Sequence, residues 1–315
     1  MDSIISQAFI VTLLAAGIRM AMPMLLAATG EIFAERSGML NINLEGQMLM
    51  GAFVSFVVGF YTNNMFLALS AGIAAGILQA MLMSVACISW GGQHVVVGIT
   101  LNIFVLGFTS FWYRVLFGVT TAPPKTDLAG SGASPIPFLS NIPGIGNILF
   151  NQNFLFYAAV VIAVGAAFVL GRTQFGLKIS AAGEHPRAAE TMGVNVTRMR
   201  YVSMAVCGAL AGLGGTYLSL ISLNRFMDNI TAGRGFIALA IVIFGKWNPK
   251  LVFAASLIFG ITDAFQLRLQ AVGVEIPYQF MLMLPYLLTI IVMVITARKS
   301  HTPDALGLNY ERELK

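Results

Sequence analysis

Hydrophobic residues in this chain gather into long runs separated by short polar stretches. The runs cover residues 7–29, 44–60, 65–90, 95–117, 154–171, 201–223, 236–244, 251–269 and 280–297. Most of them approach the ~20 residues that a helix needs to cross a bilayer core of about 30 Å. Because a backbone in lipid must satisfy its own hydrogen bonds, the pattern predicts an all-α, polytopic membrane helix bundle with about nine membrane elements.

Two of these elements are too irregular to be plain spanning helices. Residues 236–244, between Gly235 and Gly245, would rise only about 14 Å as a helix, which is typical of a half-helix in a transporter core. Residues 37–46 place glycines and polar side chains at the mouth of an apolar run. We expect either segment to form a broken helix that is buried in protein or lines a wet cavity.

The composition excludes a water-soluble globule. Hydrophobic residues make up 57% of the 315 residues and charged residues 10%, and the mean hydropathy is +0.82, whereas soluble chains carry about 25% charged residues. The net charge of +5 is not gathered into a patch with interleaved aromatic residues, so no nucleic-acid partner is expected. No basic stretch precedes the first apolar run, so we expect that run to stay in the mature protein.

Basic residues predict the orientation in the membrane. With the amino terminus outside, the inner stretches hold twelve of them and the outer stretches four, which satisfies the positive-inside rule. The inner ones are Arg36, Arg172, Lys178, Arg187, Arg198, Arg200, Lys246, Lys250, Arg298, Lys299, Arg312 and Lys315, and the outer ones are Lys125, Arg225, Arg234 and Arg268. We therefore expect one transmembrane domain over residues 1–315, with a cytoplasmic tail at 298–315.

No catalytic or metal-binding pattern is visible. His94, His185 and His301 lie in different loops, and Cys87 and Cys207 sit far apart in apolar runs, where they are interpreted as small core residues. We expect no catalytic, metal or cofactor site.

A segment at residues 171–180 resembles a phosphate-binding loop at a glance. Leu177 stands between its second glycine and Lys178, so the lysine is not placed to reach a terminal phosphate. Any use of ATP would therefore come from a partner.

Two further patterns concern contacts. Gly72 and Gly76, and likewise Gly208 and Gly212, permit close approach of helices, and we favour packing within the chain over a dimer interface. The outer loop at residues 118–152 contains five prolines, and we leave open whether it is a docking surface for an external partner or a connector.

The inner loop at residues 172–200 carries a net charge of +3 from five basic and two acidic residues. Within it, Pro186 suits a first helical position, Glu184 complements the helix dipole and Gly193 can end a two-turn helix. Such a short helix is marginal in water, so something must pack on it. We favour a cytoplasmic motor protein over a lipid surface.

The chain resembles a known family. The resemblance rests on residues 30–38 (GEIFAERSG), 41–46 (NINLEG), 93–102, 183–193, 235–240 (GFIALA) and 259–270, and it extends over nearly the whole chain. These segments are similar to permease subunits of bacterial ABC importers for nucleosides and simple sugars, specifically the shorter nucleoside-type permease that works beside a longer paralogue.

The resemblance implies a type II ABC importer-like fold and three kinds of partner. These are a paralogous permease, an ATPase with two nucleotide-binding domains, and an external substrate-binding protein or lipoprotein. It also implies that the inner helix couples the permease to the ATPase, through Gly183, Glu184, His185, Pro186, Arg187, Ala188, Ala189 and Glu190. His185 departs from the asparagine that is common in the family, and histidine is the poorer helix cap.

Polar residues in or beside the apolar runs are candidates for the translocation path. Our first choices are Asn43, Glu45 and Asn102, and our second choices are Asp263 and Gln266, which share one helix face. Unpaired polar groups facing lipid would cost several kcal/mol, so they should face a cavity or a partner. As an alternative, Glu45 could pair with Arg36, and Asp263 with Arg19 or Arg114, to hold helices together.

The function expected from these observations is a pore-forming subunit of an ATP-driven importer in the bacterial cell membrane. The few charges within the spans favour a neutral hydroxylated solute, and the resemblance favours nucleosides over plain sugars. The alternative is an ion-coupled secondary transporter in which Glu45 and Asp263 carry the coupling ion. An ATPase that co-purifies with the chain would distinguish the two.

Overall fold

The computed structural model describes residues 7–118, 146–272 and 302–310, with isolated positions at 123–140 and 280–294. Regular structure in this part of the chain is helical apart from one isolated β-bridge, between Lys125 and Arg225. The helices are α1 (Gln7–Arg36), α2 (Leu44–Thr62), α3 (Met65–Ser84), α4 (His94–Phe117), α5 (Phe154–Arg172), α6 (Gln174–Glu184), α7 (Pro186–Thr191), α8 (Val196–Thr216), α9 (Arg234–Phe244) and α10 (Pro249–Val272). Short π-helical turns extend α3 (Val85–Ser89) and α8 (Tyr217–Ser222) and precede α5 (Gly146–Phe150).

The predicted membrane elements are confirmed where the structure describes them. Seven helices in the described residues are long and apolar enough to cross a membrane, and α9 is an eighth, shorter apolar helix. The run at 280–297 lies mostly outside the described residues, and its described positions are helical. The largest difference is in α1, which continues to Arg36, seven residues beyond the predicted apolar run.

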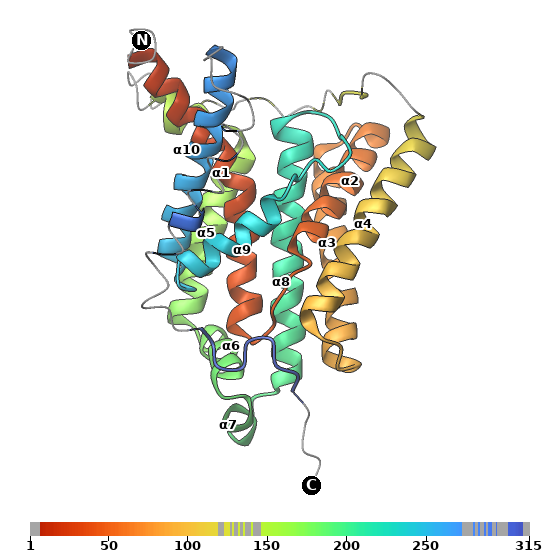
Figure 1. Ribbon diagram of the computed structural model, residues 1–315, viewed down its shortest axis with the longest axis vertical. Helices are drawn as coiled ribbons and strands as arrows, with labels where there is room; N and C mark the ends of the chain where they lie inside the picture. The colour runs from red at the N-terminus through yellow and green to blue at the C-terminus, as the bar shows by residue number, and fades with distance from the viewer. Residues whose placement is uncertain are drawn as a thin grey trace.

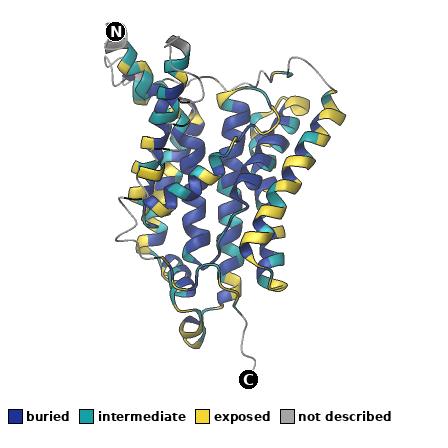
Figure 2. Cartoon of the chain, in the orientation of Figure 1, coloured by how far each residue is buried: buried dark blue, intermediate teal, exposed yellow. Residues whose placement is uncertain are grey.

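Helix α8 forms the centre of the bundle. It packs against α1, α2 and α3. Of the residues in its most apolar stretch, 72% are buried, whereas in the corresponding stretch of α4 only 17% are buried. Figure 2 shows the contrast between the buried α8 and the exposed outer side of α4. The exposed side chains of α4 include Val96, Ile103 and Phe111, which lipid or a second subunit would have to cover.

Close helix contacts at the centre depend on glycine. A Cβ on Gly76 would lie 2.1 Å from the carbonyl oxygen of Gly208, and one on Gly212 would lie 2.4 Å from the carbonyl oxygen of Gly72. The two small-residue motifs of the sequence therefore pack against each other, between α3 and α8. This confirms packing within the chain.

Two helices begin inside the bundle rather than at its surface. The α1–α2 segment (residues 37–43) leaves the lower end of α1 and runs back beside α8, so that α2 starts at mid-height (Figure 1). Helix α9 crosses the bundle at a similar height and has only 11 residues. Both predicted breaks are confirmed.

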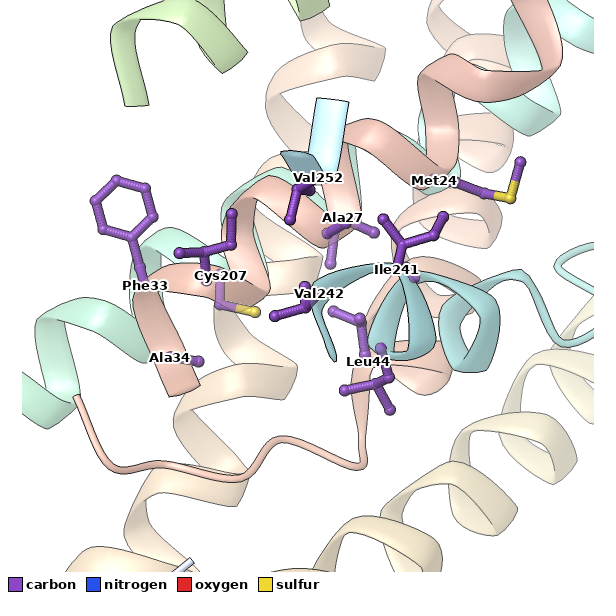
Figure 3. Close-up of a cluster of buried hydrophobic side chains, with 14 of the residues drawn as sticks. Met24, Ala27, Phe33, Ala34, Leu44, Cys207, Ile241, Val242 and Val252 are labelled. Carbon is purple, nitrogen blue, oxygen red and sulfur yellow. The ribbon is translucent and has the colours of Figure 1, made fainter. Parts of the chain in front are cut away.

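A hydrophobic cluster packs around α9. Side chains of α1, α2, α8, α9 and α10 meet there (Figure 3), among them Met24, Ala27, Phe33, Ala34, Leu44, Cys207, Ile241, Val242 and Val252. The free thiol of Cys207 is buried, as is that of Cys87, which agrees with their interpretation as core residues.

The loop predicted to lie inside is more ordered than the sequence suggested. Residues 172–200 contain α6, α7 and the start of α8, and of the two short helices only α7 was predicted. Thr173 caps α6 by accepting a hydrogen bond from the backbone N–H of Gly176 at 3.2 Å. The predicted outer loop at 118–152 lies mostly outside the described residues, and its described end is the turn Gly146–Phe150.

We expect Gly212→Leu to destabilise the bundle, because the new side chain would meet the backbone of α3. Overpacking of this kind costs about 1–3 kcal/mol. The matched control is Gly107→Leu on the exposed side of α4, where no atom lies within 4 Å of an added Cβ. Thermal unfolding in detergent should show a lowered Tm for Gly212→Leu alone; equal Tm values for the two variants would contradict the α3–α8 contact.

Candidate translocation site and coupling region

The start of α9 is held by Glu45, the second residue of α2. One carboxylate oxygen, Oε1, accepts hydrogen bonds from the Thr231 hydroxyl at 2.5 Å and from the N–H of Gly233 at 2.8 Å. The other, Oε2, accepts from the N–H of Gly235 at 2.6 Å. The first N–H groups of a helix have no partner within the helix, and its positive dipole end favours an anion. Glu45 therefore satisfies the exposed end of α9 inside the bundle.

Glycine permits this close approach. A Cβ on Gly235 would lie 2.5 Å from the backbone of Glu45, so no larger residue fits there without moving α9 away from α2. Gly233, with φ +83°, gives the chain the left-handed turn that points the N–H groups at the carboxylate.

An ion pair lies at the same end of α9. Arg234, the first residue of α9, contacts Asp263 of α10 at 3.2 Å. This corrects the expected pairings of Asp263 with Arg19 or Arg114, since Arg114 instead contacts Asp228 at 3.2 Å. The described contacts of Glu45 correct its expected pairing with Arg36 as well, because the α9 N–H groups take both of its oxygens.

Asn102 of α4 stabilises the first turn of α2. Its side-chain oxygen accepts from the N–H of Gly46 at 2.7 Å, and its side-chain nitrogen donates to the carbonyl of Ile42 at 2.8 Å. The amide of Asn102 therefore connects the end of the α1–α2 segment with the first turn of α2.

Asn43, just before α2, has a side chain that forms no hydrogen bond with the described groups. It is fully buried, and neither its side-chain oxygen nor its nitrogen has a hydrogen-bond partner among the described groups. Its oxygen lies near that of Asn102, since a Cβ on Gly46 would lie 2.5 Å from the first and 2.8 Å from the second. An unpaired buried amide costs about 1–3 kcal/mol, which calls for a reason to keep it.

The structure thus brings four of the five predicted path residues to the junction of α2 and α9. Asn43, Glu45 and Asn102 surround the start of α2, and Asp263 reaches the start of α9 through Arg234. Gln266 lies almost one turn further along α10 and is buried. Thr231 and Arg234 also belong to this junction, and sequence reasoning missed them because both precede or begin an apolar run without a recognisable pattern.

A second buried polar network was also missed. Glu31 accepts from the Asn41 side chain at 3.0 Å and from the Cys207 thiol at 3.2 Å, while the amides of Asn41 and Gln47 bond each other at 3.1 and 3.2 Å. All four groups are buried. They attach the middle of the α1–α2 segment to α1, α2 and α8.

Glu35, one turn after Glu31, belongs to the same end of α1 and accepts a hydrogen bond from the indole N–H of Trp247. Two carboxylates four residues apart at the end of an apolar helix were the available sequence signal. These contacts explain why α1 continues as a helix through a stretch that is polar in sequence.

The predicted coupling residues lie at the end of α6, in α7 and in the link between them. Pro186 occupies the first position of α7, and His185 precedes it without making a side-chain cap, in keeping with its weak capping ability. Gly193 follows with φ +82°, as expected for the residue that ends a helix.

The eight predicted coupling residues do not all face outward. His185, Arg187 and Ala188 are exposed, whereas Ala189 packs on Ala182 and Val196. Gly183 also points inward, since a Cβ there would lie 2.2 Å from the carbonyl oxygen of Arg36. Of the remaining three, Glu184 and Pro186 are partly buried, and Glu190 accepts a hydrogen bond from the Tyr310 hydroxyl.

An apolar groove of about 580 Å³ lies between α6 and α7. Its rim includes Leu177 and Met192, whose side chains are 70% and 84% exposed. Exposed apolar side chains beside the exposed Lys178, which also lines the groove, are typical of a surface that another protein covers.

Comparison with known proteins gives consistent results. The family model described as "Branched-chain amino acid transport system / permease component" matches residues 13–296. The guanosine ABC transporter permease NupQ of Bacillus subtilis is 37% identical over 304 residues, which cover 92% of this chain and 93% of NupQ. The nucleoside ABC transporter permease NupC of Lactococcus lactis is 37% identical over 297 residues, covering 91% and 93%.

Other relatives carry different names. TsgC13 of Haloferax volcanii, a candidate glucose ABC transporter permease, is 34% identical over 334 residues, covering 98% of this chain and 100% of TsgC13. The guanosine permease NupP, from the same Bacillus subtilis strain as NupQ, is 27% identical over 252 residues, covering 78% of this chain and 71% of NupP.

The family model covers residues 13–296, and the seven helices of the described residues that are long and apolar enough to cross a membrane agree with it. This match over most of its length shows that the chain belongs to the family of permease components of branched-chain amino acid-type transport systems.

Proposed function

We propose that this chain is the pore-forming subunit of an ATP-driven importer for nucleosides or related sugars. The observation that carries the proposal is the junction of α2 and α9, where a buried, unpaired amide lies beside the ends of two broken helices. Its closely similar relatives are named as guanosine, nucleoside and glucose permeases, all of which handle neutral hydroxylated solutes.

The ion-coupled alternative is not favoured. A coupling-ion carboxylate must be free to release its partner, but both oxygens of Glu45 are taken by the start of α9, and Asp263 is paired with Arg234. These contacts give both acids a role in positioning α9. The relatives, moreover, are named as ABC permeases.

Three partners follow from the proposal. The ATPase binds the surface formed by α6 and α7, and a substrate-binding protein delivers solute at the opposite end of the bundle. A paralogous permease completes the pore; the similarity of this chain to both NupQ and NupP of one organism supports a pair of unlike permeases. In this arrangement α6 and α7 face the cytoplasm, together with the carboxyl-terminal end of the chain.

At the junction, Asn43 is the side chain best placed to contact solute. Its oxygen and amide nitrogen can exchange hydrogen bonds with a ribose hydroxyl or a base edge once the junction opens. Glu45 and Asn102 hold the two helix ends that frame it. A weak contact suits transport, because a tightly held solute would leave slowly.

The function is tested by reconstituting the complete complex in liposomes with its ATPase and binding protein. We expect ATP-dependent uptake of labelled guanosine, and competition by other nucleosides should exceed competition by glucose. Uptake that follows a proton or sodium gradient without ATP would contradict the proposal.

Asn43→Ala and Glu45→Gln should have different effects. Asn43→Ala removes an unpaired buried group, so the Tm should not fall, while uptake drops by about tenfold, the equivalent of ~1.4 kcal/mol. Glu45→Gln leaves one oxygen for three donors, so both Tm and uptake should fall.

Gln79→Ala is the matched control for Asn43→Ala, because the Gln79 amide is likewise buried without a described partner, but on α3. It should leave uptake unchanged. If Asn43→Ala and Gln79→Ala reduce uptake equally, Asn43 is not a solute contact.

Ala188→Glu tests the docking surface, since it places a longer charged side chain on the exposed face of α7. We expect the ATPase to dissociate or ATP-driven uptake to fall at least tenfold, with the Tm of the permease unchanged. Thr197→Glu, at an exposed position near the start of α8, is the control and should assemble normally. Normal uptake by both variants would remove α7 from the interface.

A further inference from the structure

Residues 302–310 form a strap across the end of the bundle where α6 and α7 lie. In Figure 1 it passes, in dark blue, from α6 toward the lower end of α8. The N–H of Ala305 donates to the carbonyl of Gly183 at 2.9 Å, and the N–H of Gly307 donates to the carbonyl of Gly38 at 3.0 Å. The first bond reaches the end of α6, and the second reaches the start of the α1–α2 segment.

The strap also contacts α7 directly. The hydroxyl of Tyr310 donates to a carboxylate oxygen of Glu190 in the coupling helix. Further back along the strap, Ala305 is buried and Leu306 packs on the hydrophobic cluster of the bundle. The strap is therefore packed against α7 at Tyr310 and against the bundle at Ala305 and Leu306.

Arg200 of α8 fastens the strap to the α1–α2 segment. Its side chain is 2% exposed; Nε donates to the carbonyl of Ser37 at 3.2 Å and one terminal nitrogen to the carbonyl of Leu308 at 2.9 Å. Its guanidinium carbon lies 5.9 Å from the centre of the Tyr310 ring. Burying a guanidinium is costly. That the buried Arg200 bonds two backbone carbonyls indicates that it holds the strap and the α1–α2 segment in a fixed relative position.

The backbone at Gly38 is shaped to this contact. Gly38 has φ +89°, which ends α1 in a left-handed turn, and a Cβ there would lie 2.8 Å from a terminal nitrogen of Arg200. A side chain at this position would both strain the turn and displace the guanidinium.

The contacts form a continuous route from the proposed ATPase-binding surface on α7 to the junction of α2 and α9. Movement of α7 would displace Tyr310 through its bond with Glu190. The strap would then pull on residues 37–38 through Gly307 and Arg200. Asn41 and Asn43 follow these residues in the same segment. Residues 39–41 of that segment are not helical, and side-chain hydrogen bonds of Asn41 and Arg200 connect the segment to α8, so a shift of the segment changes these bonds.

We propose that the strap transmits the displacement of α7 to the α1–α2 segment and so opens the junction at Asn43. This inference rests on the proposed function, since it requires an ATPase at α7. Gly183, at the end of α6, also packs directly on the end of α1, so movement of α6 can reach the α1–α2 segment without the strap. The strap adds a connection from α7 to the same segment.

The test uses the full reconstituted complex with Tyr310→Phe, Gly38→Ala and a chain ending before residue 302. The readout is solute imported per ATP hydrolysed, measured beside complex assembly and basal ATP hydrolysis. Tyr61→Phe, at an exposed position near the opposite end of the bundle, is the matched control for Tyr310→Phe.

We expect uptake per ATP to fall severalfold in Tyr310→Phe and at least tenfold in the shortened chain, with assembly and basal hydrolysis retained and Tyr61→Phe unchanged. If the shortened chain fails to assemble, Tyr310→Phe decides. Unchanged uptake per ATP in Tyr310→Phe and Gly38→Ala, even with a lowered Tm, assigns the strap to the scaffold and overturns the proposal. A wild-type complex that imports neither nucleoside nor sugar instead overturns the proposed function, and the strap proposal with it.

Discussion

The hydrogen bonds between Glu45 and the start of α9 are the interaction on which the interior of this protein depends. A helix that begins in the middle of an apolar bundle presents N–H groups that neither water nor its own carbonyls can satisfy. The carboxylate of Glu45 accepts from the N–H groups of Gly233 and Gly235, and the backbone carbonyl of Thr231 accepts from the N–H of Arg234. Without such an acceptor the 11-residue α9 could not begin where it does, inside the bundle.

Much of the fold could be predicted from the sequence because lipid imposes simple rules. The apolar runs predicted the ends of the spans to within five residues except at the end of α1, since each span must be about a bilayer long. The end of α1 was missed because Glu31 and Glu35 look like loop residues in sequence, and only the contacts with Asn41, Cys207 and Trp247 show how they are accommodated. Helix α6 was missed for a related reason, as its polar composition suggested a loop.

The candidate site was predicted as a set of residues but not as an arrangement. Polar side chains in apolar runs had to point inward, and Asn43, Glu45, Asn102 and Asp263 do meet at one junction. Their partners could not be predicted, because the ion-pair hypothesis considered only charged side chains. The backbone N–H groups of α9 act on Glu45 as a cation would. The half-helix was predicted from the glycines that bound it, but nothing in the sequence showed that its first N–H groups meet Glu45.

The strength of the Glu45 contacts argues for how the junction moves. Hydrogen bonds to a charged group contribute about 1.5–3 kcal/mol each, and leaving such a group buried without them costs more. A solute held only weakly by Asn43 could not repay the loss of all three. The start of α2 and the start of α9 should therefore move together as one body. The flexible points are then the α1–α2 segment and residues 223–233, where left-handed turns at Asn224, Asn229 and Ala232 interrupt the helices. A pathway that opens by moving a bonded pair of helix ends keeps every backbone group satisfied in both states, which is the condition that the bilayer sets.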